Sequence, residues 1–78
     1  MKEIMIRLST IQDVNQFVRI VASADHDIDL SSGRYVVDGK SIMGIFSLDL
    51  MNPIELTIHS EDPAVVEGLL EALKPFIA

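Results

Sequence analysis

Cysteine and tryptophan are both absent from this chain of 78 residues. The absence of cysteine excludes disulfide bonds, thiolate metal sites and thiol-based catalysis. A chain this short buries only about 60% of the surface that its unfolded form exposes, so a domain without cross-links needs a dense core of two packed layers. Hydrophobic residues make up 49% of the sequence, which is enough for such a core. We therefore expect residues 1–78 to form a single domain.

Long apolar runs and an excess of basic residues are also missing. No apolar run approaches the roughly 18 residues that a membrane-spanning helix needs, and the N-terminus lacks the pattern of a signal peptide. We therefore expect a cytoplasmic protein that does not insert into a membrane. Twelve acidic residues against six basic ones give a formal net charge of −6. This balance disfavours nucleic acid as a partner, because neutralising its phosphates requires clustered Lys and Arg.

The first third of the chain is predicted to form a strand and a helix. Apolar and polar residues alternate over 2–8, which predicts a strand with one buried face. Ser9 and Gln12 have the spacing of a capping box, which predicts the start of a helix. Apolar residues then recur at helical spacing, and the helix is expected to end near residue 24.

A hairpin and a second helix are predicted in the middle of the chain. The segments 27–30 and 34–38 are expected to pair around Gly33, a residue typical of turns. Ser41 is a good helix N-cap, and the apolar residues after it predict a helix that ends near residue 50. Pro53 terminates this segment, because proline has no N–H to donate and disfavours helix at the residue before it.

The last third is predicted to form a strand over 54–58 and a final helix. Asp62 and Pro63 are suited to the N-cap and the first helical position. One face of that helix carries the apolar residues Val66, Leu69, Leu70, Leu73 and Ile77. Gly68 costs up to about 1 kcal/mol relative to Ala within a helix, so we expect it where two backbones approach closely. The order βαββαβα predicts an α+β two-layer domain, an antiparallel sheet covered on one face by helices.

The segment Lys40-Ser41-Ile42-Met43-Gly44, followed by Ser47-Leu48, resembles the regulatory-serine segment of HPr, the small phosphocarrier of the bacterial sugar phosphotransferase system. Together with the length and the element order, this segment identifies the chain as HPr-like over nearly its whole length. The resemblance implies the HPr fold, in which four antiparallel strands have the order 1-4-2-3 and three helices lie on one face.

The phosphoacceptor site of HPr proteins is altered in this sequence. Family members carry Gly-x-His-Ala-Arg-Pro at the start of the first helix, where the histidine accepts a phosphoryl group from enzyme I and the arginine steadies it. The corresponding stretch contains Thr10, Ile11, Gln12 and Asp13. Depending on one residue of alignment, Thr10 or Ile11 stands at the histidine position. Likewise, Gln12 or Asp13 stands at the arginine position. We therefore expect no histidine phosphocarrier chemistry and no catalytic residue in this segment, where Asp13 would also repel a bound phosphate.

Ser41 is predicted to serve the fold and is also a candidate for regulation. As an N-cap, its hydroxyl would accept a backbone N–H two or three residues later, which contributes about 1 kcal/mol. In many HPr proteins the matching serine is phosphorylated by HPr kinase, and the product helps a catabolite-control transcription factor. The resemblance therefore implies that Ser41 is a phosphorylation site, with the added charge at a helix N-terminus that favours it.

The Ser41 helix carries more apolar residues than so short a helix can bury. Ile45 and Leu48 are the candidates for the core. Ile42, Met43 and Phe46 are the candidates for an exposed patch of the kind that marks protein contacts. In HPr proteins this region docks enzyme I, HPr kinase and the transcription factor, so the resemblance implies these partners. A self-contact through the same patch would give a homodimer.

The remaining polar residues give weaker signals. His26 and His59 lie outside the first helix, and each is expected to be an exposed side chain without a function. Asp25, Asp27 and Asp29 alternate like part of a calcium loop, but no Gly or terminal Glu completes that pattern. No nucleophile–base pair, Gly-rich phosphate loop or metal-ligand spacing occurs, so neither a metal nor another cofactor is expected.

The sequence therefore favours a non-catalytic, HPr-like module that binds proteins and regulates, in the context of sugar transport and catabolite repression. Two alternatives stay open. One is a true phosphocarrier with a relocated phosphoacceptor, His26 or His59. The other is a small ligand-binding domain that has kept only the fold, because a fold does not dictate a function.

Overall fold

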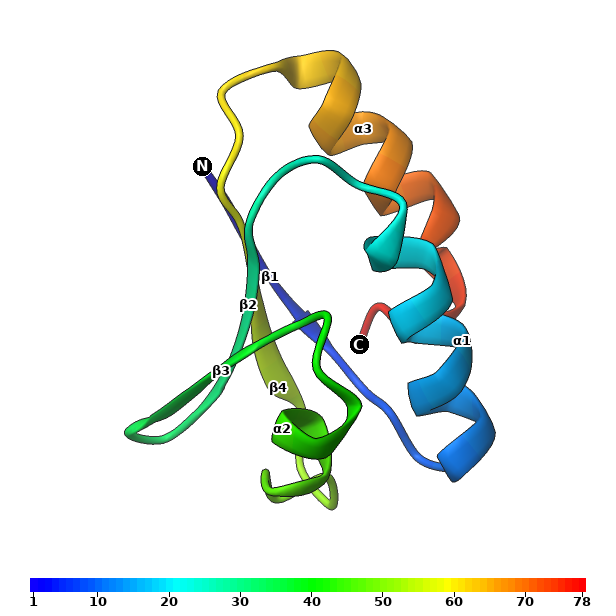
Figure 1. Cartoon of the computed structure of the whole chain (residues 1–78), viewed down its shortest axis with the longest axis vertical. Helices are drawn as coiled ribbons and strands as arrows, with labels where there is room; N and C mark the ends of the chain where they lie inside the picture. Colours follow the sequence, from blue (N-terminus) through cyan, green and yellow to red (C-terminus); the bar gives the residue numbers. More distant parts are fainter.

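A four-stranded antiparallel sheet forms one layer of the molecule, and the helices form a second layer over one of its faces (Figure 1). The computed structural model describes residues 1–78. In chain order the elements are β1 (Lys2–Ile6), α1 (Ile11–Ala22), β2 (Ile28–Ser32), β3 (Tyr35–Asp38), α2 (Ile42–Phe46), β4 (Ile54–Ile58), α3 (Pro63–Ala72) and the 3₁₀ helix η1 (Lys74–Phe76). The predicted order βαββαβα is confirmed. None of the helices combines the length and apolarity needed to cross a membrane.

The strands lie in the order β1-β4-β2-β3, so the expected order 1-4-2-3 is confirmed. The outer edge of β1 is partly covered by the C-terminal residues. Arg7 donates its backbone N–H to the Phe76 carbonyl at 2.7 Å, and Ala78 donates to the Met5 carbonyl at 3.0 Å. β3 forms the opposite edge of the sheet, and no strand lies beyond it.

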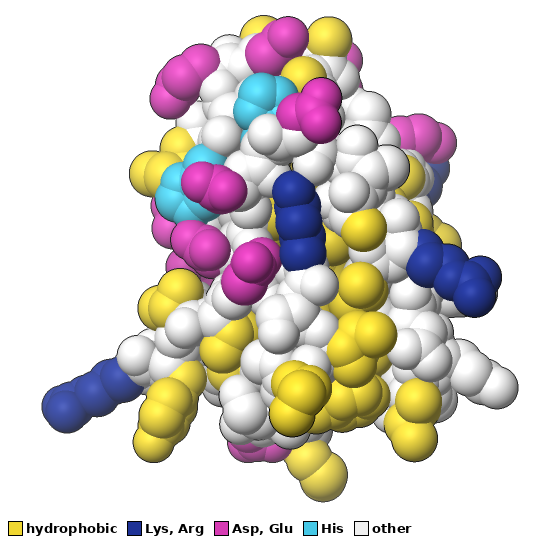
Figure 2. Space-filling view, in the orientation of Figure 1, with side chains coloured by type: hydrophobic (Ala, Val, Ile, Leu, Met, Phe, Trp, Pro, Cys, Tyr) yellow, Lys and Arg dark blue, Asp and Glu magenta, His cyan; other side chains and the backbone are white.

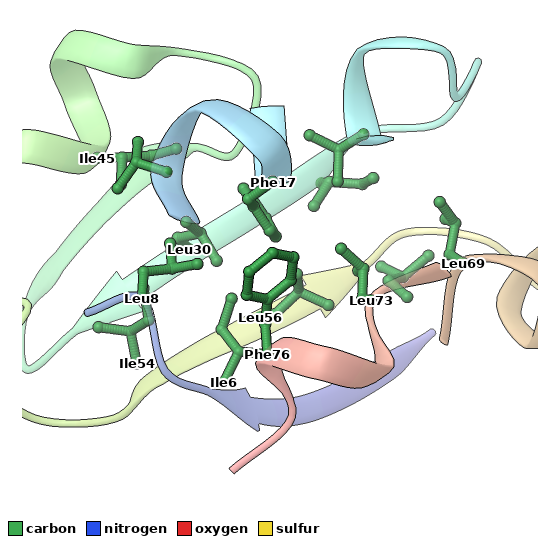
Figure 3. Packing of buried hydrophobic residues seen from close by; sticks show 14 of the residues in the cluster. Ile6, Leu8, Phe17, Leu30, Ile45, Ile54, Leu56, Leu69, Leu73 and Phe76 are labelled. Atoms are coloured by element: carbon green, nitrogen blue, oxygen red, sulfur yellow. The ribbon is translucent and has the colours of Figure 1, made fainter. Parts of the chain in front are cut away.

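The core lies between the sheet and the helices (Figure 3). Alternate strand residues face this layer because successive side chains of a strand point to opposite faces. The labelled core residues are Ile6, Leu8, Leu30, Ile54 and Leu56 from the sheet side and Phe17, Ile45, Leu69, Leu73 and Phe76 from the helix side. The buried faces predicted for 2–8 and 54–58 are therefore confirmed.

Helix α1 begins one residue later than the capping-box spacing of Ser9 and Gln12 predicts. Thr10 is the N-cap, and the third helical residue that completes the capping box is Asp13. The sequence fits both registers, because Ser9 and Thr10 are both good N-cap residues. In the register that forms, α1 buries Val14 and Phe17 against the core.

The β2–β3 hairpin turns on Gly33, as predicted. Ser32 pairs with Tyr35, which leaves Gly33 and Arg34 as the loop. Gly33 has a φ of 60°, a backbone conformation that costs glycine little, and no other residue has a positive φ. A positive φ at the first loop residue alone is the pattern of the type II′ turn, whose twist matches that of the two strands.

Helix α2 is shorter than predicted and ends at Phe46 instead of near residue 50. Ser47 is its C-cap, and the chain then enters a turn that Asp49 stabilises. The Asp49 carboxylate accepts the Met51 backbone N–H and the Asn52 side-chain amide, both at 3.0 Å. Aspartate competes with helical hydrogen bonding in this way, so the apolar run alone overestimates the length of the helix.

Helix α3 begins as predicted, with Asp62 as the N-cap and Pro63 as the first helical residue. The predicted face is wrong at its end, because Phe76 is buried and Ile77 is exposed. The 3₁₀ turn of η1 shifts the helical phase by about one residue. The expectation for Gly68 is also wrong, since a Cβ added there would meet no atom within 4 Å.

Candidate functional site

The Ser41 hydroxyl caps helix α2. Its Oγ accepts the Gly44 backbone N–H at 3.1 Å, and this hydrogen bond is partly buried. The Ser41 carbonyl accepts the Ile45 N–H at 3.0 Å, so the residue supports the first turn with two groups. The predicted role of Ser41 as an N-cap is therefore confirmed, and the N–H that its side chain accepts belongs to Gly44, the third helical residue.

The residues after Ser41 divide between core and surface as predicted. Ile45 and Leu48 are buried. Ile42, Met43 and Phe46, which we call the α2 patch, are 42%, 86% and 45% exposed. Figure 2 shows hydrophobic side chains gathered over the lower part of this view, where Figure 1 places α2. Exposed apolar side chains that lie together are common at protein contacts.

The segment after α2 adds apolar residues beside the loop that follows β1. Leu50 and Met51, in the segment after α2, line a depression of about 390 Å³ together with Arg7 and Ser9. The Met51 side chain is almost fully exposed. Sequence reasoning missed Met51, although an exposed methionine beside a turn is an adaptable apolar contact residue.

The start of α1 is closed by its own capping box. Asp13 Oδ2 accepts the Ser9 N–H at 3.0 Å and the Thr10 N–H at 3.3 Å. Thr10 Oγ1 in turn accepts the Asp13 N–H at 3.0 Å. Helix N-termini favour negative charge, and here the Asp13 carboxylate of the chain itself already supplies one at this position. Ile11 and Gln12 are exposed and add no basic group.

Both histidines lie far from the start of α1. His26 follows the C-terminal end of α1, a helix of 12 residues that is about 18 Å long. His59 follows β4 at the end where Ile58 pairs with Lys2, whereas Thr10 follows the opposite end of β1. The structure therefore does not bring either imidazole to Thr10.

His59 is exposed, as predicted, but it is not isolated. Its Nε2 lies 2.7 Å from the Asp29 carboxylate on the open face of the sheet. This pair lines a depression of about 430 Å³ together with Asp27, Asp38 and two valines of β3. Figure 2 shows most of the acidic side chains and both histidines in the upper part of the view. We call this feature the acidic depression; no sequence signal marks it, because its residues come from three strands.

The structure contains no group of three or more acidic or histidine side chains placed to hold a metal ion. Asp25, Asp27 and Asp29, which alternate in the sequence, do not converge on one point. Asp27 and Asp29 line the acidic depression, whereas Asp25 lines a different surface hollow beside α3.

A family model described as the PTS HPr component phosphorylation site matches residues 12–78. The match covers most of the chain but begins after Thr10 and Ile11, at the segment where the capping box closes α1. No curated protein sequence gives a significant match.

A solved structure also resembles this chain. The crystal structure of HPr-C-His from Thermoanaerobacter tengcongensis superposes with a TM-score of 0.76, over 95% of this chain and 92% of that one. The two sequences are 23% identical over the match. At this identity, the similarity shows a common fold.

Proposed function

Because this chain belongs to the HPr family of the phosphotransferase system, we propose that it is an HPr-like module that binds proteins without carrying a phosphoryl group on a histidine. It is a non-catalytic domain of the sugar phosphotransferase system and of catabolite repression. The observation that carries the proposal is the contrast between two helix starts. The start of α1 is closed by Asp13, whereas α2 presents a serine and an exposed apolar patch.

The chemistry at the start of α1 argues against a phosphocarrier. Thr10 and Ile11 offer no imidazole, and a threonine phosphate ester does not pass its phosphoryl group on as readily as a phosphohistidine. The Asp13 carboxylate already accepts two backbone N–H groups that could otherwise bind phosphate oxygens. These donors would not be available to an incoming phosphate, and the negative charge of Asp13 would repel it.

The α2 patch is the proposed docking surface. The candidate partners are enzyme I, HPr kinase and a catabolite-control transcription factor. Binding should depend on Met43, which is 86% exposed and makes little contact with the core. Met43→Asp would place a charge in the docking surface with little cost to the fold.

The binding test compares two methionines. Met43→Asp lies in the α2 patch, and Met5→Asp lies on the open face of the sheet, where Met5 is also exposed. Both variants change the net charge equally. Titration of enzyme I and HPr kinase should show weaker binding for Met43→Asp only. Equal affinities of the two variants and the unmodified chain would rule out the α2 patch as the docking surface.

Regulation by phosphorylation of Ser41 is part of the proposal. Phosphorylation would replace the capping hydroxyl with a charged group at the start of α2, next to the patch. Intact-mass spectrometry after incubation with HPr kinase and ATP should show one added phosphate, and Ser41→Ala should abolish it. An unmodified mass, with a family HPr phosphorylated in the same tube, would remove the switch from the proposal.

A relocated phosphoacceptor is the alternative with a candidate residue. His59 is held by Asp29 at 2.7 Å, an arrangement that orients an imidazole. However, Asp27 and Asp38 line the same depression, and their charges would repel the phosphoryl donor. Phosphoryl transfer that His59→Ala abolishes would favour this alternative over the protein-binding module.

A further inference from the structure

Strand β3 is an open edge with exposed apolar residues. The other edge of the sheet, β1, is partly covered by the C-terminal residues, whereas no strand or terminus pairs with β3. Tyr35 and Val36 are 75% and 63% exposed. Exposed edges of this kind can pair with another strand, and proteins usually protect them with proline, a bulge or inward charges. β3 contains no proline and no bulge, and its protection is limited to its length of four residues and the charge of Asp38 at its end.

The hydrogen-bonding groups of alternate β3 residues point away from the sheet. Gly39 donates its N–H to the Ile28 carbonyl at 2.7 Å, so the pair Ile28–Gly39 is a hydrogen-bonded pair of the β2–β3 ladder. In an antiparallel ladder every second residue has this geometry, so the backbone N–H and C=O groups of Tyr35 and Val37 also point toward β2. The N–H and C=O groups of Val36 and the N–H of Asp38 therefore face solvent, whereas the Asp38 carbonyl already accepts the Ser41 N–H at 3.0 Å.

This geometry restricts how two copies of β3 can pair. In an antiparallel pair, residues whose backbone groups point outward must lie opposite one another. A two-fold axis at Val36 places Val36 opposite Val36 of the second copy and Arg34 opposite Asp38. Moving the register by two residues in one direction places Arg34 opposite Lys40, and in the other direction it leaves Asp38 without an opposite charge. Only the register centred on Val36 pairs both charges.

The side chains fit the same register. Val36 and Asp38 lie on the open face of the sheet, because Val37 between them pairs with the buried Leu30, and Arg34 lies in the turn directly before β3. Arg34 is exposed and forms no ion pair. On the neighbouring strand Asp29 lies directly opposite Asp38, and like charges in this position destabilise a sheet. A second copy would insert one Arg34 beside each such pair, in the acidic depression.

We propose that β3 pairs antiparallel with β3 of a second copy around Val36, with Arg34 of each copy in the acidic depression of the other. The contact is isologous, so it closes as a two-fold dimer and leaves neither β3 edge free. It is separate from the α2 patch, and it does not depend on the function proposed above.

Charge reversal on each side of the contact tests the pairing. Arg34→Asp places two aspartates opposite each other at both ends of the strand pair, and Asp38→Arg places two arginines there. Each variant alone should raise the dimer dissociation constant by about tenfold or more, because two attractive pairs per dimer become repulsive. An equimolar mixture of the two should form a heterodimer, since every Asp then faces an Arg. Sedimentation equilibrium at high protein concentration measures all three samples.

Two controls make the result specific. Arg19→Asp, on the exposed side of α1, changes the net charge as Arg34→Asp does and should leave the dimer unchanged. Circular dichroism and thermal unfolding should show that all variants fold. Because the chain has no cysteine, Val36→Cys and Met43→Cys report the contact surface directly by oxidative cross-linking. Rapid cross-linking is expected for Val36→Cys only.

Three outcomes would overturn the proposal. The first is a monomer at every concentration, which would leave the β3 edge to a strand of a different protein. The second is a dimer that cross-links through Met43→Cys and not through Val36→Cys, which would place the contact on the α2 patch. The third is a mixture of Arg34→Asp and Asp38→Arg that associates no better than either variant alone.

Discussion

Substitutions of Ser41 separate its structural role from its proposed regulatory role. Ser41→Ala removes the Oγ that accepts the Gly44 N–H at 3.1 Å and leaves that N–H without a partner within the chain. Loss of a serine N-cap costs about 1 kcal/mol, within a range of about 0.5–2. For a domain of this size, about 1 kcal/mol lowers the melting temperature by roughly 4–8 °C.

Ser41→Asp should behave differently, because a carboxylate is also a good N-cap. The chain provides its own example in Asp62, whose Oδ1 accepts the Ala64 N–H at 3.0 Å at the start of α3. We therefore expect Ser41→Asp to unfold within about 0.5 kcal/mol of the unmodified chain. It should nevertheless carry a negative charge at the place where a phosphate would lie.

Urea unfolding followed by circular dichroism measures these differences. With an m-value of about 1 kcal/mol per M, Ser41→Ala should unfold at a urea concentration about 1 M lower. Ser41→Asp should stay close to the unmodified chain. The reasoning is refuted if Ser41→Ala loses no stability, or if Ser41→Asp loses as much as Ser41→Ala. Partner affinities of the two variants then report the regulatory role, since equal affinities would argue against a serine switch.

Three further predictions concern positions that support the site. Gly68→Ala should stabilise the chain by up to about 1 kcal/mol. Gly39→Ala should destabilise it by about 1–3 kcal/mol, because the added Cβ would lie 2.9 Å from the Ile28 carbonyl oxygen. Urea unfolding measures both changes, and opposite signs would contradict these predictions. Asp13→Ala should lower the free energy of unfolding by about 1 kcal/mol and speed amide hydrogen exchange at the start of α1. Unchanged exchange would refute the capping role of Asp13. Ile45→Ala should lower the free energy of unfolding by about 2–5 kcal/mol, and Met43→Ala by less than about 0.5 kcal/mol. Thermal unfolding measures both, and similar losses would contradict the division between core and surface.

Much of the fold was predictable from local sequence signals. The alternation over 54–58 and the N-caps Ser41 and Asp62 are confirmed because each depends on neighbouring residues only. The start of α1 could not be fixed, since Ser9 and Thr10 offer two registers one residue apart. Pro75 lies in the 3₁₀ turn that follows α3. Because proline disfavours continued α-helix, it indicated that the helical spacing would not extend to Ile77.

The long-range features were beyond local reasoning. The contact between His59 and Asp29 joins residues that are 30 positions apart and requires the register between β2 and β4. The acidic depression likewise requires three strands to lie side by side. The exposure of the α2 patch was predictable from the number of apolar residues in a short helix. The exposure of Met51 was not, because the helix ends earlier than its apolar run suggests.

Phosphoryl transfer from enzyme I tests the proposed function most directly. The chain is incubated with enzyme I and labelled phosphoenolpyruvate, beside a family HPr that carries the active histidine. We expect the HPr to be labelled and this chain to stay unlabelled, because the start of α1 has no imidazole and already holds the Asp13 carboxylate. An acid-labile phosphoryl group on the chain, lost in His26→Ala or His59→Ala, would contradict the proposed function.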